Sequence, residues 1–221
     1  MPLRFQGPLL IVGGGQVAPD LLTSLAEHAA GIVGADRGGD TIIAAGLVPD
    51  AVIGDMDSVA DPGAFGSPTT VVSLAEQDTT DFEKCLYSTD APVTIAVGMT
   101  GGRFDHTLAA LHAVTRYGRE RAIILVDAHD LALVVSGSIH FSIAPGTRVS
   151  IYPLGRTEFA GSEGLEFPLE GLVLEQGSRI GTSNSAVAGT VSIAVAPGEQ
   201  SPWLLILDRA HLGTLLAGLL P

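Results

Sequence analysis

Carboxylates stand in pairs after two of the apolar segments of this chain. Asp55 and Asp57 follow the apolar run 51–53, and Asp78 and Asp81 follow the next apolar segment. Two like charges this close repel each other unless a cation lies between them. Oxygen ligands suit Mg²⁺, which binds proteins through one or two carboxylates together with substrate phosphates. The two pairs therefore predict a metal site, although either pair alone is also consistent with a solvated turn or a helix start.

A glycine-rich loop with an arginine follows a third apolar segment. In the sequence GMTGGRFDH, Arg103 lies directly before a predicted helix. A strand, a glycine loop and a helix start form the local geometry of an anion site, and a guanidinium can hold phosphate through two parallel hydrogen bonds. Asp105 and His106 follow, and His106 taken alone is equally consistent with a surface residue. The acidic pairs and this loop together predict a site for a metal ion and a polyphosphate.

A glycine segment near the N-terminus matches a dinucleotide-binding pattern. Gly13, Gly15 and Ala18 satisfy G-x-G-x-x-A, and Asp36 ends the next apolar run about 20 residues on. Pro19, however, places the helix start near residue 18, whereas the pattern requires the helix to begin inside the glycine loop. A tight turn or a looser nucleotide contact is therefore favoured.

The segment ADRGGD ends the second apolar run. Its two glycines, which follow Asp36 and Arg37, would let a ligand approach the backbone closely. The alternative is an ordinary turn between a strand and a helix. For Asp40 the favoured interpretation is a helix cap.

Short apolar runs alternate with amphipathic segments over roughly the first 130 residues. Strands are predicted at 7–15, 31–36, 50–55, 69–75, 91–98 and 121–128. Helices are predicted at 18–31, 40–50, 80–89 and 104–118. Thr80 and Glu83 have the spacing of a capping box at the start of the third helix. This alternation predicts a parallel sheet that is covered on both faces.

From about residue 133 the pattern changes to alternation with a period of two between Gly and Pro turns, which predicts antiparallel strands. Residues 211–220 are consistent with either a strand extension or a short helix. We therefore expect an α/β fold with two domains. An N-terminal parallel-sheet α/β domain would span residues 1–135, and a small antiparallel β domain would span residues 136–221.

The composition narrows the classes of function. The 221 residues include 24 acidic and 11 basic side chains, which gives a net charge of −13. This charge argues against a nucleic-acid surface, which needs a basic footprint, and suits a cationic ligand. No run of about 18 apolar residues could span a bilayer, so we expect a cytoplasmic protein. The single cysteine, Cys85, lies on the apolar face of a predicted helix and is expected to be a packed thiol.

The ordered motifs resemble those of the thiamine pyrophosphokinase family. They are ADRGGD, PDAVIGDMDS, QDTTDFEKCL, GMTGGRFDH, EGLEFPLEG and GTSNS, and they extend from about Gly31 to Asn184. The resemblance implies Mg²⁺-dependent transfer of diphosphate from ATP to the hydroxyl of thiamine, which gives thiamine diphosphate and AMP. It also implies a β-sandwich-like second domain and a homodimer that binds thiamine near the subunit interface.

The same resemblance assigns site residues by their motif positions. It implies that four carboxylates form the metal and ATP cluster: Asp55, Asp57, Asp78 and Asp81. With Arg103, these would be the catalytic residues. The positions expected to bind ATP or its phosphates are Asp36, Arg37, Gly38, Gln77, Thr80, Arg103, Asp105 and His106. The positions expected to bind thiamine are Phe167, Ser183 and Asn184. Two positions depart from the family pattern, which usually has Trp or Tyr near Phe167 and often an acid where Ser185 stands.

Three alternatives remain open at this point. A pyrophosphokinase could act on another hydroxymethyl heterocycle, such as a pterin. A dinucleotide-dependent oxidoreductase would use the glycines near the N-terminus, but it leaves both acidic pairs and Arg103 without a role. A non-catalytic sensor of nucleotide or thiamine would have no need of four carboxylates.

Overall fold

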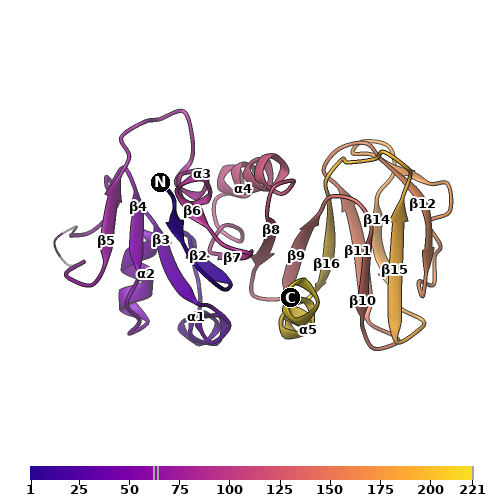
Figure 1. The fold of residues 1–221 in the computed structure, drawn as a ribbon, viewed down its shortest axis with the longest axis horizontal. Helices are drawn as coiled ribbons and strands as arrows, with labels where there is room; N and C mark the ends of the chain where they lie inside the picture. Colours follow the sequence, from indigo (N-terminus) through magenta and orange to yellow (C-terminus); the bar gives the residue numbers. More distant parts are fainter. Residues whose placement is uncertain (62, 64, 221) are drawn as a thin grey trace. The chain divides into compact units, whose positions relative to one another are not determined.

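The chain forms two compact units, which are seen in the computed structural model in Figure 1. The described residues are 1–61, 63 and 65–220. The first unit comprises Met1–Ala113 and Ile123–Ala128, and the second comprises Val114–Ala122 and His129–Pro221. The first combines parallel strands with helices and the second consists mainly of antiparallel strands, so the predicted fold class is confirmed.

The sheet of the first unit has the order β8-β7-β2-β3-β4-β5. Its strands are β2 (Leu9–Val12), β3 (Gly31–Ala35), β4 (Ala51–Gly54), β5 (Thr70–Ser73), β7 (Val93–Val97) and β8 (Ala122–Val126). The pairs of β2 with β7, β2 with β3, β3 with β4 and β4 with β5 are parallel. Every residue of β2, β4 and β7 is buried, which is typical of strands covered on both faces. All six predicted strands are therefore present.

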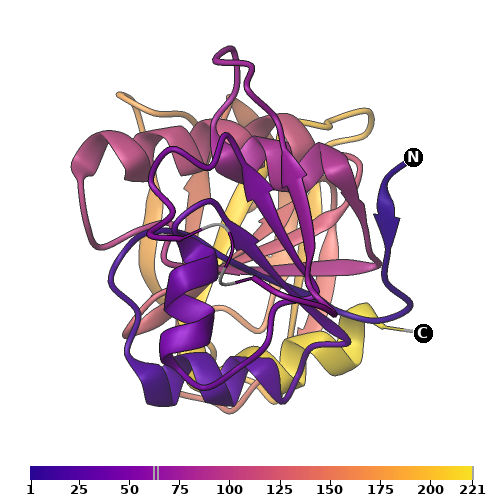
Figure 2. The ribbon, with the colours of Figure 1, turned by 90° about the vertical axis from the view of Figure 1, so that its left-hand side faces the viewer.

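Helices cover both faces of this sheet. Figures 1 and 2 show α1 (Pro19–Ala26) and α2 (Gly38–Ala44) on one face and α3 (Asp81–Ser88) on the other. The fourth predicted helix is α4 (Phe104–Tyr117). The sequence did not predict the small parallel pair of β1 (Leu3–Arg4) with β6 (Thr89–Asp90), because each strand has only two residues.

The registers of the parallel strands place the candidate site residues at one edge of the sheet. Val12 at the end of β2 lies opposite Gly34 and Val97, and Ala35 at the end of β3 lies opposite Ile53. Ligands of open parallel sheets bind beyond the carboxyl ends of the strands. The loops that follow β2, β3, β4, β5 and β7 therefore meet at the edge where a ligand is expected.

The second unit contains two antiparallel sheets, with the orders β14-β11-β16-β9 and β10-β15-β12-β13. The first sheet consists of β9 (Asp130–Val135), β11 (Arg148–Pro153), β14 (Gly181–Ser185) and β16 (Trp203–Asp208). The second consists of β10 (Ile139–Ser142), β12 (Thr157–Glu163), β13 (Val173–Leu174) and β15 (Thr190–Val195). Antiparallel strands in this part of the chain are as predicted.

An aromatic pair joins the two sheets of the second unit. Phe159 on β12 and Trp203 on β16 are both fully buried, and their ring centroids lie 5.6 Å apart in an edge-to-face arrangement. Because the rings come from different sheets, the sheets pack face to face as a sandwich. The chain ends in a short 3₁₀ turn, Arg209–His211, and helix α5 (Leu212–Leu219), so the helix alternative for this segment is the correct one. Among the described residues, no helix has the length and apolar character that a membrane span requires.

Candidate functional site

Three carboxylates converge at the carboxyl edge of the parallel sheet. Asp36 follows β3, and Asp55 and Asp57 follow the neighbouring strand β4. One oxygen from each lies within 4.8 Å of an oxygen of each of the others, and this is the one group of potential metal ligands found in the described residues. The predicted pairing of Asp55 with Asp57 is therefore present, and Asp36, expected only among the ATP-binding residues, joins it.

Asp36 has the chemistry expected of a cation ligand. Its side chain is buried, and its Oδ1 atom has no hydrogen-bond partner among the described residues. Burial raises the pKa of Asp36 above its usual value, with smaller contributions from the charges of Asp81 and Asp55. A buried polar atom normally has a partner, and a divalent cation among three carboxylates would supply one. The donor set, which consists only of oxygen, fits Mg²⁺.

Asp55 and Asp57 are brought together by a turn, not by an extended strand. Strand β4 ends at Gly54, and Met56 has a φ of +67°, in the left-handed region. The backbone N–H of Asp57 donates to Oδ1 of Asp55 over 3.2 Å, and the side chain of Met56 packs on the apolar cluster that contains Val52. A non-glycine residue in this conformation is strained and must be held by its surroundings. The proximity of the pair was predicted correctly from its spacing, but the geometry is that of a tight turn.

Asp55 is held from a second direction by Gln77 and Lys84. Nε2 of Gln77 donates to Oδ2 of Asp55 over 2.8 Å, and Nζ of Lys84 lies 3.9 Å from the same oxygen. The hydrogen bond from Gln77 and that from the backbone of Asp57 lower the pKa of Asp55, and the charge of Lys84 adds to this effect. The Asp55 carboxylate is therefore kept ionised and fixed in orientation.

Lys84 is a buried ammonium group next to the site. Its side chain is 2% exposed, and Nζ lies 3.0 Å from Oδ1 of Asp81, three residues earlier on α3. Burial alone would lower the pKa of Lys84, but the hydrogen bond and charge of Asp81 and the charge of Asp55 outweigh it and raise this pKa. Lys84 thus provides a fixed positive charge that links α3 to the loop after β4. The sequence analysis missed it, although the Asp81–Lys84 spacing is typical of a helical ion pair.

The second predicted acidic pair lies outside the three-carboxylate group. Asp81 is the first residue of α3 and is paired with Lys84. Asp78 is exposed in the loop before the helix, where its backbone N–H donates to Glu76. Thr80 caps the helix in the predicted capping box with Glu83. Asp81 is therefore linked to the three-carboxylate group through Lys84, which contacts both Asp81 and Asp55. A metal role for Asp78 and Asp81 stays a prediction.

Arg103 and Asp105 bind each other at the start of α4. Nε of Arg103 donates to one carboxylate oxygen of Asp105 over 3.1 Å and Nη2 donates to the other over 2.6 Å. This pair lowers the pKa of Asp105. The backbone N–H of His106 also donates to Asp105. All three residues are exposed. Arg103 holds the Asp105 carboxylate through two parallel hydrogen bonds, which is the geometry that a guanidinium also uses to bind phosphate.

The glycines after Asp36 serve packing. A Cβ atom at Gly38 would lie 1.8 Å from the carbonyl oxygen of Val12, so only glycine allows α2 to begin this close to β2. The helix consequently starts at Gly38, earlier than predicted. Asp40 therefore lies in its first turn and is not its cap, as had been favoured. The Asp40 carboxylate accepts a hydrogen bond from the backbone of Ala60, and Arg37 remains exposed before the helix.

The dinucleotide-like glycines also have a packing role. The backbone N–H of Gly15 donates to the carbonyl of Gly98 over 3.0 Å, and a Cβ atom at Gly13 would lie 2.7 Å from the same oxygen. Helix α1 begins only at Pro19, after the loop. The glycines therefore let the loops after β2 and β7 approach each other, and the pattern does not form the start of a nucleotide-binding helix.

The residues expected to bind thiamine lie together in the second unit. The buried side-chain amide of Asn184 accepts from the backbone N–H of Phe167 over 3.0 Å and donates to the Phe167 carbonyl over 2.7 Å. Phe167 is 60% exposed. Ser183 has a φ of +61°, and its backbone N–H donates to the hydroxyl of Ser150. Asn184 thus fixes the backbone of Phe167, and contact of these residues with thiamine stays a prediction.

Comparisons with known proteins identify the family of this chain. Residues 22–126 match the family described as thiamin pyrophosphokinase, catalytic domain. Thiamine pyrophosphokinase 1 of Arabidopsis thaliana is 31% identical over 182 residues, which cover 74% of this chain and 67% of that protein. The crystal structure of thiamin pyrophosphokinase from Geobacillus thermodenitrificans is 27% identical, covers 91% of this chain and 97% of its own, and superposes with a TM-score of 0.74. The chain therefore belongs to the thiamine pyrophosphokinase family.

Proposed function

We propose that this protein is a thiamine pyrophosphokinase, which transfers a diphosphate group from ATP to the hydroxyl of thiamine and releases AMP. The observation that carries the proposal is the convergence of Asp36, Asp55 and Asp57 in a chain of this family. The buried Oδ1 of Asp36 in this group has no hydrogen-bond partner among the described residues. No observation favours another hydroxymethyl substrate, and the packing role of the N-terminal glycines removes the basis of the oxidoreductase alternative.

Mg²⁺ would be held by Asp36, Asp55 and Asp57, with Asp78 and Asp81 as further oxygen ligands or acceptors of its bound waters. When bound, the metal would neutralise charge on the phosphate oxygens of ATP. Lys84 would hold Asp81 and Asp55 in place by its contacts with both carboxylates. Without such a fixed cation, these five carboxylates would repel one another more strongly.

The remaining site residues would align the phosphates. Arg103 would exchange one or both of its bonds to Asp105 for phosphate oxygens, because both side chains are exposed and the guanidinium geometry suits either partner. The side chains of Gln77 and Thr80, the backbone around Arg37 and Gly38, and His106 would complete the phosphate and nucleotide contacts. Phosphoryl chemistry depends mainly on such alignment and charge neutralisation.

The hydroxyl oxygen of thiamine would attack the β-phosphorus of ATP, the bond to the α-phosphate oxygen would break, and AMP would leave. Either Asp78 or Asp81 would accept the hydroxyl proton. Phe167, with Ser183 and Asn184, would bind thiamine in the β domain of residues 136–221, while residues 1–135 would bind ATP. We further propose that the enzyme is a cytoplasmic homodimer.

Measuring AMP formation from ATP and Mg²⁺ with and without thiamine tests this proposal. AMP that appears only with thiamine, in step with thiamine diphosphate, is the expected result. AMP that forms only with a different alcohol would mean that this alcohol, and not thiamine, is the substrate. Formation of ADP would contradict attack at the β-phosphorus, and tight thiamine binding without turnover would favour a sensor.

A further inference from the structure

The loop between β5 and α3 carries three of the proposed site residues: Gln77, Asp78 and Thr80. All three are exposed, so packing does not fix their positions. Exposed loops of polar residues normally sample several conformations. Some other feature must hold this loop if Gln77 is to stay against Asp55.

A single carboxylate, that of Glu76, accepts several hydrogen bonds from this loop and one from α3. Its Oε2 accepts from the backbone N–H of Asp78 over 2.8 Å and from the backbone N–H of Thr79 over 3.0 Å. Its Oε1 accepts from the hydroxyl of Thr79 and from the phenol of Tyr87, the latter over 2.9 Å. These donors, that of Thr79 first, lower the pKa of Glu76 to about 2, so the carboxylate is ionised at neutral pH.

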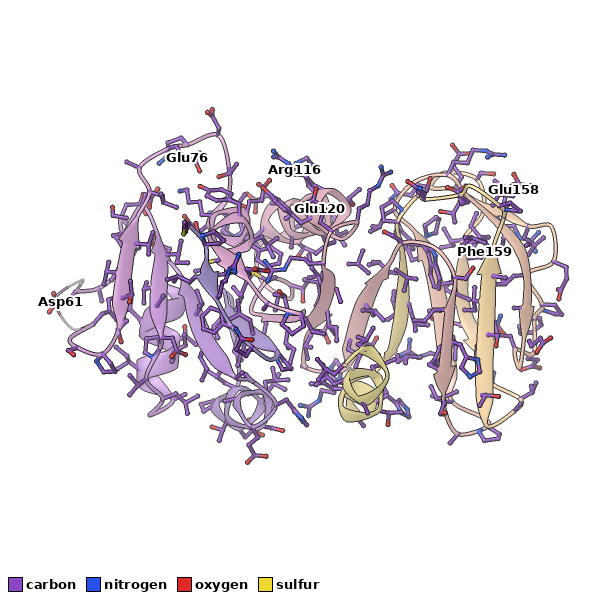
Figure 3. The ribbon with its side chains drawn as sticks, viewed as in Figure 1. Asp61, Glu76, Arg116, Glu120, Glu158 and Phe159 are labelled. Carbon is purple, nitrogen blue, oxygen red and sulfur yellow. The ribbon has the colours of Figure 1, made fainter. Side chains whose placement is uncertain are left out.

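Tyr87 is the donor that comes from outside the loop. It lies on α3, which is fixed by its buried residues Phe82, Cys85 and Leu86 and by its capping box. Figure 3 labels Glu76 on the loop between β5 and α3. The bond from Tyr87 therefore ties the loop to a rigid element of the fold, and Glu76 passes this restraint to the backbone on its C-terminal side.

The restraint reaches the acidic group through Gln77. This residue lies between Glu76 and Asp78, and the backbone N–H of Asp78 donates to the Glu76 carboxylate. The side-chain amide of Gln77 donates to Oδ2 of Asp55 over 2.8 Å. Asp55 is in turn one of the three converging carboxylates. Loss of the Glu76 contacts would free Gln77, and Asp55 would lose the partner that orients it.

We propose that Glu76 and Tyr87 are positioning residues that set Gln77 against Asp55 and thereby tune divalent-metal binding and the use of ATP. Only the part of this inference that concerns the use of ATP rests on the proposed function. Neither residue is expected to touch substrate. The competing explanation is that Glu76 only stabilises the start of α3, in which case its loss would lower stability without altering metal affinity.

The experiment compares Tyr87→Phe and Glu76→Gln with wild type and with Glu27→Gln, a control at the exposed end of α1. Mn²⁺ binding without ATP would be followed from the electron paramagnetic resonance signal of free Mn²⁺. Steady-state kinetics with ATP and thiamine varied separately and hydrogen exchange at the Asp78 and Thr79 amides would be measured on the same samples.

We expect the Mn²⁺ dissociation constant and the KM for ATP to rise about 3- to 10-fold in both variants, as loss of a charge-assisted hydrogen bond implies. The KM for thiamine should not change, and both amides should exchange faster. Because Tyr87 acts through Glu76, the double variant should be no worse than Glu76→Gln alone. The Glu27→Gln control should match wild type.

Faster exchange or a lower melting temperature with unchanged Mn²⁺ affinity and unchanged KM for ATP would overturn the inference. If Glu76→Gln does not fold, Tyr87→Phe, which removes only one hydroxyl, decides the question. If wild type forms no AMP from ATP and thiamine, the proposed function fails, and the Mn²⁺ measurement still decides whether the Glu76–Tyr87 pair positions the metal ligands.

Discussion

The side-chain amide of Gln77 donates a hydrogen bond to Oδ2 of Asp55 over 2.8 Å, and this bond joins two loops that are 22 residues apart in the sequence. It links the loop after β4, which carries two of the converging carboxylates, to the loop before α3. The amide is also the first cause of the lowered pKa of Asp55. The two sequence motifs thus form a single site.

Replacing Gln77 with Glu should impair the site more than replacing it with Ala. The new carboxylate would face Asp55 and repel it, whereas Ala only removes the hydrogen bond. We expect kcat/KM for ATP to fall about 10-fold in Gln77→Ala, as for other hydrogen bonds to a charged group, and further in Gln77→Glu. Steady-state kinetics at saturating thiamine would measure both. Equal losses in the two variants would argue against direct contact with Asp55.

Replacing Lys84 with Met should destabilise the protein in a metal-dependent way. The substitution keeps the aliphatic volume but removes the charge between Asp55 and Asp81, which should lower the free energy of unfolding by about 2 kcal/mol. A divalent cation would then be the main remaining source of positive charge. Thermal unfolding should show a larger stabilisation by Mg²⁺ in Lys84→Met than in wild type. An equal Mg²⁺ effect in both would contradict this role.

Part of this site could be predicted from the sequence, and part could not. The proximity of Asp55 to Asp57 and the capping box of Thr80 with Glu83 depend on short spacings, which the sequence displays directly. The contacts of Lys84 with Asp55 and of Glu76 with Tyr87 could not be found in this way, because they join segments that are far apart in the sequence. The burial of Lys84 was also hidden, because a single charged residue on a helix has no signature of burial.

The fold shows the same distinction. Alternation of apolar runs with helical segments identified every strand of the parallel sheet, because each run is short and apolar. Strands β2, β4 and β7 are buried along their whole length. In the second unit, β9 and β16 pair with each other along six residues, but the segments are far apart in the chain and both are largely apolar. Their pairing depends on long-range packing that a period of two does not reveal.

Gly38→Ala should disrupt the first unit. Its Cβ atom would lie 1.8 Å from the carbonyl oxygen of Val12, so either α2 or β2 must shift. We expect a loss of about 3 kcal/mol in the free energy of unfolding, at the upper end of overpacking effects. Gly14→Ala is the matched control, because its Cβ atom would make an ordinary contact of 3.6 Å with Arg37. Chemical denaturation of both variants would measure the difference, and similar stabilities would contradict the packing role.

Glu199→Gln should remove a pH-dependent contribution to stability. The carboxylate accepts from the backbone of Ser201, Gln200 and Glu158, and the Ser201 N–H is the first cause of its lowered pKa. Because the pKa of Glu199 is lower in the folded protein than its usual value of 4.5, the ionised carboxylate stabilises the folded state at pH values above 4.5. This contribution is lost as the pH falls below 4.5. At pH 7 the variant should be about 1 kcal/mol less stable than wild type.

The difference between Glu199→Gln and wild type should shrink as the pH falls below about 4.5. Glu163→Gln, at an exposed position of β12, is the control and should match wild type throughout. Denaturation curves between pH 3 and pH 7, spanning the usual carboxylate range, would provide the comparison. A difference that stays constant with pH would mean that the ionised form of Glu199 has no special role.

The measurement that tests the central claim most directly is AMP formation from ATP, Mg²⁺ and thiamine by Asp55→Asn and Asp57→Asn alongside wild type. Each variant keeps the shape of the side chain and removes one charge from the converging carboxylates. We predict that wild type forms AMP only with thiamine and that both variants lose more than about 100-fold of this activity while remaining folded by circular dichroism. Thiamine-dependent activity retained in both variants would contradict the assignment of these carboxylates to the metal site.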